Sequence, residues 1–260
     1  MGPQANSSSR ASGGPRLPTE ARLIVALDVS SSAGAGKIVS ALGDSVLIYK
    51  VGMQLYTAEG PRIVRDLVES GRQVFLDLKY HDIPTTVGAA VREAAKLGVS
   101  LLTVHASGGA KMLRAAVEAA GNSPGQAAGV EDRRPGILAV SVLTSMDESD
   151  LSQTGVSGPV RDQVVRLAST ALDAGCRGVV SSAQEAKMLR DKFGRDFLIV
   201  TPGVRPRGQE RLDQVRVVTP AEAIALGASH IVVGRPITGA EDPARAAKEI
   251  QEEIASAVNS

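Results

Sequence analysis

The amino-acid sequence predicts a single (β/α)8 TIM barrel, an α/β fold whose active site lies at the carboxyl ends of the strands. Short apolar runs alternate with longer amphipathic stretches, about eight such units follow one another, and the chain has 260 residues. Barrels of this kind span about 250 residues as one domain. A doubly wound open sheet is the rival architecture, but eight regular units without a domain break favour a closed barrel.

Eight short apolar runs, rich in β-branched residues, are typical of strands buried on both faces of a parallel sheet. In chain order they span residues 23–28, 46–52, 74–79, 101–106, 137–144, 178–182, 198–203 and 230–235. The stretches between them carry apolar residues at three- and four-residue spacing with charges on the other face, which indicates amphipathic helices. Clear examples span residues 60–71, 86–98, 158–175 and 242–258.

The first twenty residues lack this pattern. Residues 1–20 are rich in Ser, Gly and Pro, and they contain no continuous apolar stretch of the kind that a secretory signal peptide needs. We therefore expect a disordered leader or a cloning remnant there. The barrel catalytic domain is expected over residues 21–260.

The overall composition argues against several classes of protein. The chain has 29 Lys and Arg against 28 Asp and Glu and only 2% aromatic residues, so neither charge nor base stacking favours nucleic acid. No apolar run approaches the ~20 residues that cross a bilayer. Cys176 is the one cysteine, and the 3 histidines lack metal-ligand spacing. We expect a soluble cytoplasmic protein with no metal site and no nucleic-acid or membrane partner.

Charged residues at the ends of the first three predicted strands mark a candidate site. An unpaired charge in a buried strand is costly, yet Asp28 ends the first run and Lys50 lies in the second. Asp77 and Lys79 end the third run, and their spacing of two residues points both side chains to one face. We expect the four charges to pair near the barrel axis. A buried salt-bridge network without a function is the alternative, but such networks cost desolvation.

The loops after the seventh and eighth runs carry a second candidate site. Barrels often bind phosphate there, where backbone N–H groups at a short helix N-terminus point at the anion. Arg205 follows the seventh run in TPGVRP, and Gly234 and Arg235 end the eighth in VVGRPI. A guanidinium can donate two parallel hydrogen bonds to phosphate, so we expect a phosphate site. An ordinary turn with a solvated Arg is the alternative.

Eight tracts between Leu23 and about Ala247 resemble, in order, the orotidine 5'-phosphate decarboxylase family. They are ALD, YKVG, FLDLKYHDIP, LLTVHA, SVLTS, TPGVRP, DQVRVVTP and VVGRPI. The DxKxxD element formed by Asp77, Lys79 and Asp82 is highly specific when it ends a third barrel strand. The resemblance implies decarboxylation of orotidine 5'-phosphate to uridine 5'-phosphate (UMP) and CO₂, without a cofactor, in de novo pyrimidine biosynthesis.

The resemblance also implies a catalytic group of residues. Lys79 would donate the proton to the ring carbon that loses CO₂, and Asp77 would lie beside the leaving carboxylate. Lys50 would complete their charge network. Asp82 would come from the partner subunit of a homodimer, and Thr86 would reach across the same interface.

Substrate-binding roles follow from the same resemblance. Asp28 and Lys50 would contact the ribose hydroxyls, and Thr144 would lie near the pyrimidine portion. The phosphate would be held by residues from the last two strand ends and the loop between them: Arg205, Gln214, Gly234 and Arg235. Gln214 would lie on a loop that closes over the phosphate.

Elementary chemistry agrees with these roles. Loss of CO₂ leaves a ring carbanion with no adjacent carbonyl or imine, and the sequence contains no motif for a cofactor that would act as an electron sink. A fixed ammonium in a dry cavity stabilises such a charge, and Lys79 supplies it. Asp77 adds repulsion toward the substrate carboxylate, which disappears as CO₂ leaves. Binding energy from the remote phosphate would close the loop and orient the ring.

Three other functions share part of the pattern. Related barrels that act on sugar phosphates, such as ketogulonate phosphate, share DxKxxD but use Mg²⁺ and carry a Glu where this chain has Lys50. An aldolase would use Lys79 as a Schiff-base former, but flanking Asp77 and Asp82 favour its protonated form. A non-catalytic phosphate-binding barrel is the third alternative, and it would leave the occupied catalytic positions unexplained.

Overall fold

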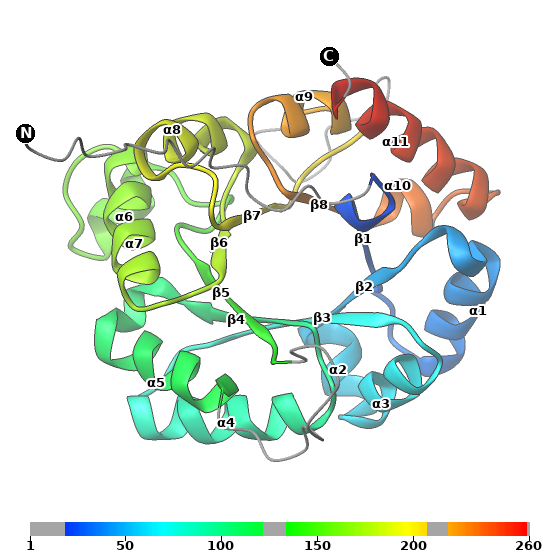
Figure 1. The fold of residues 1–260 in the computed structure, drawn as a ribbon, viewed down its shortest axis with the longest axis horizontal. Coiled ribbons are helices and arrows are strands. Elements are labelled where there is room, and N and C mark those ends of the chain that lie inside the picture. Colours follow the sequence, from blue (N-terminus) through cyan, green and yellow to red (C-terminus); the bar gives the residue numbers. More distant parts are fainter. Residues whose placement is uncertain (1–18, 122–133, 207–217, 259–260) are drawn as a thin grey trace, which may run out of the picture.

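The computed structural model describes residues 19–121, 134–206 and 218–258. Eight parallel strands close into a barrel in sequence order, and β8 pairs with β1 (Figure 1). The strands are β1 (Leu23–Ala26), β2 (Ile48–Gly52), β3 (Gln73–Tyr80), β4 (Leu101–His105), β5 (Gly136–Val140), β6 (Gly178–Val180), β7 (Leu198–Thr201) and β8 (His230–Val233). The predicted (β/α)8 architecture is confirmed, and the open sheet is excluded.

Helices surround the barrel on its outside (Figure 1). They are α1 (Ser32–Leu42), α2 (Met53–Glu59), α3 (Arg62–Glu69), α4 (Pro84–Lys96), α5 (Gly109–Gly121), α6 (Glu148–Gln153), α7 (Val160–Asp173), α8 (Ala183–Phe193), α9 (Pro220–Ala225), α10 (Arg235–Thr238) and α11 (Pro243–Val258). Short 3-10 helices are η1 (Thr19–Arg22), η2 (Gly43–Ser45) and η3 (Ala106–Gly108). The four amphipathic stretches singled out in the sequence correspond to α3, α4, α7 and α11.

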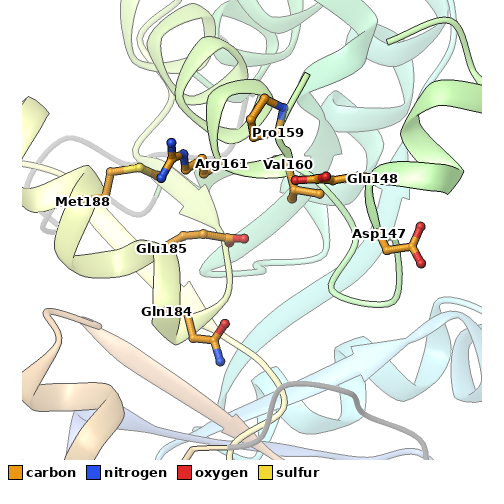
Figure 2. Close-up of a pocket in the computed structure, with 8 residues that line it drawn as sticks. All are labelled: Asp147, Glu148, Pro159, Val160, Arg161, Gln184, Glu185 and Met188. Carbon is orange, nitrogen blue, oxygen red and sulfur yellow. The ribbon is translucent and has the colours of Figure 1, made fainter. Parts of the chain in front are cut away.

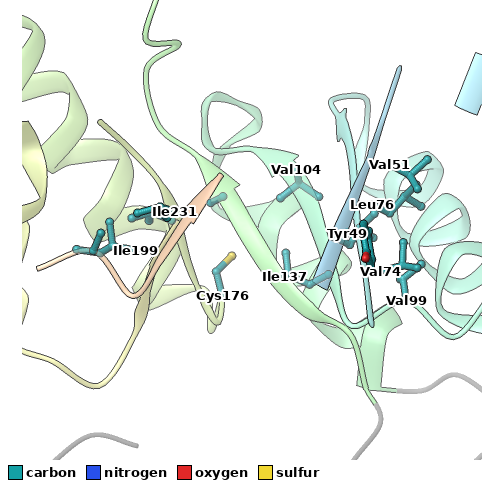
Figure 3. Close-up of a cluster of buried hydrophobic side chains, with 14 of the residues drawn as sticks. Tyr49, Val51, Val74, Leu76, Val99, Val104, Ile137, Cys176, Ile199 and Ile231 are labelled. Carbon is teal, nitrogen blue, oxygen red and sulfur yellow. The ribbon is translucent and has the colours of Figure 1, made fainter. Parts of the chain in front are cut away.

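Two buried apolar layers hold the fold together, because alternate strand residues face opposite sides of the barrel wall. The inner layer fills the barrel interior and consists of Ile24, Ala26, Ile48, Phe75, Leu101, Leu138, Val200 and Val232. The outer layer lies between the strands and the helices. Figure 3 shows part of it, including Tyr49, Leu76 and Ile231. The barrel is therefore a packed core rather than a pore.

Several strands end before the apolar runs that predict them. The fifth run extends to residue 144, but β5 ends at Val140. Ser141 N still donates to Val180 O across 3.2 Å, and the chain then turns, with Met146 N donating to Leu143 O. Apolar composition alone therefore overestimates strand length, since the loops at this end of the barrel also contain buried apolar residues.

Local capping fixes where several outer helices begin. Asp147 and Asp150 form reciprocal side-chain to backbone bonds at the start of α6, and Thr219 and Glu222 do the same at α9. Helix α4 begins with Pro84, whose fixed φ suits the first helical turn. The loop between β3 and α4 spans residues 81–83 and carries Asp82, the last residue of the DxKxxD element.

The predicted leader, residues 1–20, falls almost entirely outside the described residues. In the part of the chain that the structure describes, every helix is too short or too polar to cross a membrane.

Candidate active site

Four charged side chains from three neighbouring strand ends pair at the carboxyl end of the barrel. Lys50 Nζ lies 2.9 Å from Asp28 Oδ1 and 3.8 Å from Asp77 Oδ2. Lys79 Nζ lies 2.8 Å from Asp77 Oδ1. Acid and base thus alternate along one continuous charge network, defined here as Asp28, Lys50, Asp77 and Lys79.

Strand alternation explains why these side chains meet. Ile48 belongs to the inner layer, so Lys50, two residues later on β2, faces the same side. Phe75 belongs to that layer as well, and Asp77 follows it by two residues on β3. The charge network therefore continues the inner layer toward the carboxyl end, where the apolar filling stops.

The network is partly buried and open toward one end. The side chains of Lys50 and Asp77 are only 12% and 13% exposed, whereas that of Asp28 is 55% exposed. Burial strengthens each attraction because the local dielectric is lower than that of water. Mutual pairing offsets part of the desolvation cost that isolated buried charges would carry. The site thus keeps two ammonium groups fixed beside a solvent-accessible rim.

The backbone around Lys79 departs from regular strand geometry. Leu76 pairs with Leu102 and Tyr80 pairs with Val104, so β3 advances four residues while β4 advances two. Lys79 has φ +52°, the one positive φ at a non-glycine residue among those described. Such a bulge bends the strand and re-aims its side chains.

Thr103 of β4 lies opposite the bulge and contacts both of its charged residues. The side chain is completely buried. Its hydroxyl donates to Asp77 Oδ1 across 3.0 Å and accepts from Lys79 N across 2.9 Å. Thr103 therefore ties the backbone of one charged residue to the carboxylate of the other.

Gly52, at the end of β2, gives the Lys50 ammonium its space. A Cβ on this residue would lie 2.9 Å from Lys50 Nζ and 3.4 Å from Asp28 Oδ1. The first distance is closer than real Cβ atoms come to a neighbouring heavy atom. Any other residue type would therefore displace the Lys50 side chain or the Asp28 carboxylate from their ion pair.

Two histidines pack beside the charge network. The rings of His81 and His105 have centroids 5.5 Å apart with a tilt of 34°. Burial lowers the pKa of His105 below its usual range, and the charges of His81 and Lys79 lower it further. A neutral imidazole at the end of β4 therefore lies next to the cationic end of the network.

The ends of β7 and β8 carry the second group of predicted residues. Arg205 is buried after β7, and its backbone N–H donates to Val218 O across 3.0 Å. Gly234 lies between β8 and α10, and Arg235 is the exposed first residue of α10. A Cβ on Gly234 would lie 3.6 Å from Asp28 Oδ2. The end of β8 thus adjoins the exposed end of the charge network. Gln214 lies outside the described residues.

The remaining predicted residues lie on the rim. Asp82 and Thr86 are both exposed. Among the described residues, the Asp82 carboxylate accepts a hydrogen bond from Ile83 N and forms no ion pair with either lysine of the network. Thr144 is half-buried in the turn after β5. Within one chain, ion pairs therefore connect Asp28, Lys50, Asp77 and Lys79. In the described part of the chain, Asp82 and Thr86 do not contact this network.

Comparison with known proteins identifies the family. The model of the orotidine 5'-phosphate decarboxylase / HUMPS family matches residues 21–250. The chain belongs to this family. It is 49% identical over 241 residues to orotidine 5'-phosphate decarboxylase of Halorhodospira halophila, covering 93% of this chain and 99% of that protein. It is 50% identical over 237 residues to that of Syntrophotalea carbinolica, covering 91% and 96%.

Solved structures agree with the membership in the orotidine 5'-phosphate decarboxylase family. The crystal structure of orotidine 5'-phosphate decarboxylase from Lactobacillus acidophilus superposes with a TM-score of 0.79 at 40% identity. The match covers 90% of this chain and 99% of that one. The family resemblance and the fold expected from the sequence are both confirmed.

A separate pocket of about 660 Å³ lies on the outside of the barrel wall (Figure 2). It opens between the start of α6, the start of α7 and the first turns of α8, and no residue of the charge network lines it. Its walls are formed by Asp147, Glu148, Pro159, Val160, Arg161, Gln184, Glu185 and Met188. The pocket therefore forms no part of the candidate site at the strand ends.

Proposed function

We propose that this member of the orotidine 5'-phosphate decarboxylase family converts orotidine 5'-phosphate to UMP and CO₂ without a cofactor, in pyrimidine biosynthesis. As a carboxy-lyase it would break one carbon–carbon bond. The observation that carries the proposal is the alternating charge network of Asp28, Lys50, Asp77 and Lys79. It places a fixed ammonium at the carboxyl end of the barrel, where TIM-barrel enzymes perform their chemistry.

Lys79 is the proposed proton donor. When the bond to CO₂ breaks, the electron pair stays on the ring carbon, and the Lys79 ammonium stabilises this charge and then transfers its proton there. The neutral amine regains a proton from solvent. Asp77, 2.8 Å from Lys79 Nζ, would lie beside the substrate carboxylate and repel it until CO₂ leaves.

The proposed binding roles divide the substrate between two parts of the rim. Asp28 and Lys50 bind the ribose hydroxyls, and Thr144 lies near the pyrimidine. Arg205, Gln214, Gly234 and Arg235 hold the phosphate. The short approach between Gly234 and Asp28 supports this division, since ribose and phosphate are adjacent in the substrate. Phosphate binding energy would then orient the ring over Lys79.

We also propose a cytoplasmic homodimer in which the partner completes each site. Asp82 and Thr86 are exposed in the single chain, and Ile83 between them has 64% of its surface exposed. The proposed interface would bury this apolar side chain together with its polar neighbours. Asp82 would then approach the partner's charge network rather than that of its own chain. The catalytic domain is proposed to span residues 21–260.

The geometry disfavours the two rival enzymatic readings. Lys50 Nζ lies between the carboxylates of Asp28 and Asp77, at the position where a divalent cation would need to be. Its positive charge would repel the Mg²⁺ of a sugar-phosphate enzyme. The Lys79 ammonium is held in an ion pair with Asp77 at 2.8 Å, and a Schiff-base former would have to leave this contact to attack a carbonyl.

The decisive experiment is turnover of orotidine 5'-phosphate in excess EDTA, followed by the ultraviolet change as the orotate ring becomes uracil. We expect rapid conversion that the chelator leaves unchanged. Conversion that requires added Mg²⁺ would point to the sugar-phosphate type of site. A well-folded protein that releases no UMP would refute the proposed function.

A further inference from the structure

We propose that Thr103 is a positioning residue that holds the Asp77–Lys79 segment in its reactive geometry. The inference rests on the proposed function, because it assigns Thr103 a part in the step that Lys79 performs. Thr103 itself would not touch the reacting atoms. It would act through the carboxylate of Asp77 and the backbone of Lys79.

The first support is that the Thr103 hydroxyl forms one hydrogen bond with each of the two charged residues, as donor to one and as acceptor from the other. It donates to Asp77 Oδ1 across 3.0 Å and accepts from Lys79 N across 2.9 Å. The side chain has no exposed surface. Because water has no access to this position in the described structure, neither bond has a solvent substitute if the hydroxyl is removed.

The second support is the broken ladder between β3 and β4. Leu76 pairs with Leu102 and Tyr80 with Val104, so Thr103 alone lies opposite the three β3 residues 77–79. The Thr103 hydroxyl accepts the bond that the Lys79 N–H makes at this irregularity. Lys79 has a φ of +52°, which side chains with a Cβ rarely adopt. The hydroxyl therefore holds the backbone in a conformation that the residue would otherwise avoid.

The third support is the way in which Asp77 is shared. Its Oδ1 accepts from Lys79 Nζ at 2.8 Å and from Thr103, while Oδ2 faces Lys50 Nζ at 3.8 Å. Thr103 thereby sets the rotation of the carboxylate between the two ammonium groups. Without the hydroxyl, Asp77 is free to turn toward Lys50, and the Lys79 ammonium loses its fixed place. A misplacement of about 1 Å at a reacting centre costs about 10²-fold in rate.

The test compares substitutions that keep or remove the hydroxyl. Thr103→Val keeps the shape, and we expect kcat to fall about 100-fold while KM changes less than about threefold. Thr103→Ser keeps the hydroxyl, and we expect it to retain kcat within about tenfold of wild type. The matched control is Thr201→Val, because Thr201 on β7 is also fully buried but its hydroxyl has no partner among the described residues. It should leave kcat unchanged.

Folding is measured for every variant by circular dichroism and thermal unfolding. If Thr103→Val does not fold, Thr103→Ser and Thr103→Ala make the same comparison, since they differ only in the hydroxyl. Equal kcat values for the Ser and Ala variants, or a Val variant with wild-type kcat, would overturn the positioning role. A wild-type protein that does not convert orotidine 5'-phosphate would overturn the proposed function, and the role of Thr103 with it. An active wild type with unimpaired Thr103 variants would overturn the inference alone.

Discussion

Two polar regions of this barrel differ in how their buried groups are paired: the charge network at the carboxyl end, and the residues Arg22 and His230 at the amino end. At the carboxyl end, Asp77 accepts from Lys79 and Thr103 and also faces Lys50. At the amino end, Arg22 precedes β1 and His230 begins β8. The Arg22 Nε and His230 Nδ1 atoms are buried without a hydrogen-bond partner among the described residues. The polar groups of the charge network are thus paired with one another, whereas these two nitrogen atoms are not paired within the described part of the chain.

This contrast separates two reasons for a polar group to be buried. His230 is almost completely buried, and burial, with a smaller contribution from the charge of Arg22, lowers its pKa to about 4. It is therefore a neutral core residue at physiological pH. Lys50, Asp77 and Lys79 are more exposed than His230, form ion pairs with one another and lie beside an open rim. Burial alone does not mark a site. A better indicator is a cluster of partly buried opposite charges at the carboxyl ends of the barrel strands.

The largest expected effect on turnover comes from removing Lys79 from the charge network at the carboxyl end. Lys79→Ala removes both the ammonium and the proton donor, so we expect turnover of orotidine 5'-phosphate to fall more than about 10³-fold. The matched control is Lys96→Ala on α4, because Lys96 forms an ion pair of the same length, 2.8 Å, with Glu93 on the helix surface. The control should keep wild-type turnover. A Lys79→Ala enzyme with a tenth of wild-type activity would exclude the proposed role.

The contrast also shows what the sequence could predict. Hydrophobic patterning sufficed to predict the barrel, because short apolar runs alternate with amphipathic stretches of helical spacing. The spacing of Asp77 and Lys79 placed both on one face, since alternation is a local property of a strand. Neither spacing nor composition reveals the bulge or the positive φ of Lys79, which arise from the fit of β3 against β4. Thr103 was missed for this reason: a Thr inside an apolar run looks like an ordinary strand residue.

Gly52 belongs to the YKVG tract, but the sequence does not indicate why a glycine is needed there. In a sequence, a glycine at the end of a strand is interpreted as an ordinary turn residue. The structure shows that a side chain does not fit there because the Lys50 ammonium occupies the space. The exposed positions of Asp82 and Thr86 agree with the family resemblance, which assigns both residues to a subunit interface, but residue spacing within one chain does not indicate them. Residues whose function depends on long-range fit thus escape sequence reasoning, whereas those set by local periodicity do not.

A smaller effect on turnover is expected when a side chain is added beside the charge network than when Lys79 is truncated. Gly52→Ala places a Cβ 2.9 Å from Lys50 Nζ, so the flexible lysine must move and its ion pair with Asp28 must lengthen. We expect kcat/KM to fall about tenfold, since the ammonium is displaced but not removed. Steady-state kinetics of Gly52→Ala and of Gly36→Ala measure this. Gly36 lies in α1 with open space around its Cβ direction, so its variant should match wild type. Unchanged kinetics for Gly52→Ala would mean that the position of Lys50 is not critical.

The smallest effect on turnover is expected from His230 at the amino end. Substitution there should instead change how the free energy of unfolding depends on pH. The pKa of His230 is about 4 in the folded protein, against 6.5 in its ordinary state, so the unfolded chain binds more protons between these values. The stability associated with neutral His230 is complete above pH 6.5 and is lost as pH falls toward 4. The expected loss at pH 5 is on the order of 2 kcal/mol. Urea unfolding at pH 5 and pH 7.5 should therefore show a smaller pH dependence for His230→Gln than for wild type. Turnover at pH 7.5 should stay near that of wild type. An equal pH dependence in both proteins would show that His230 does not cause the loss of stability at low pH. A His230→Gln enzyme that folds but turns over slowly would show that the amino end of the barrel affects the site at the carboxyl end.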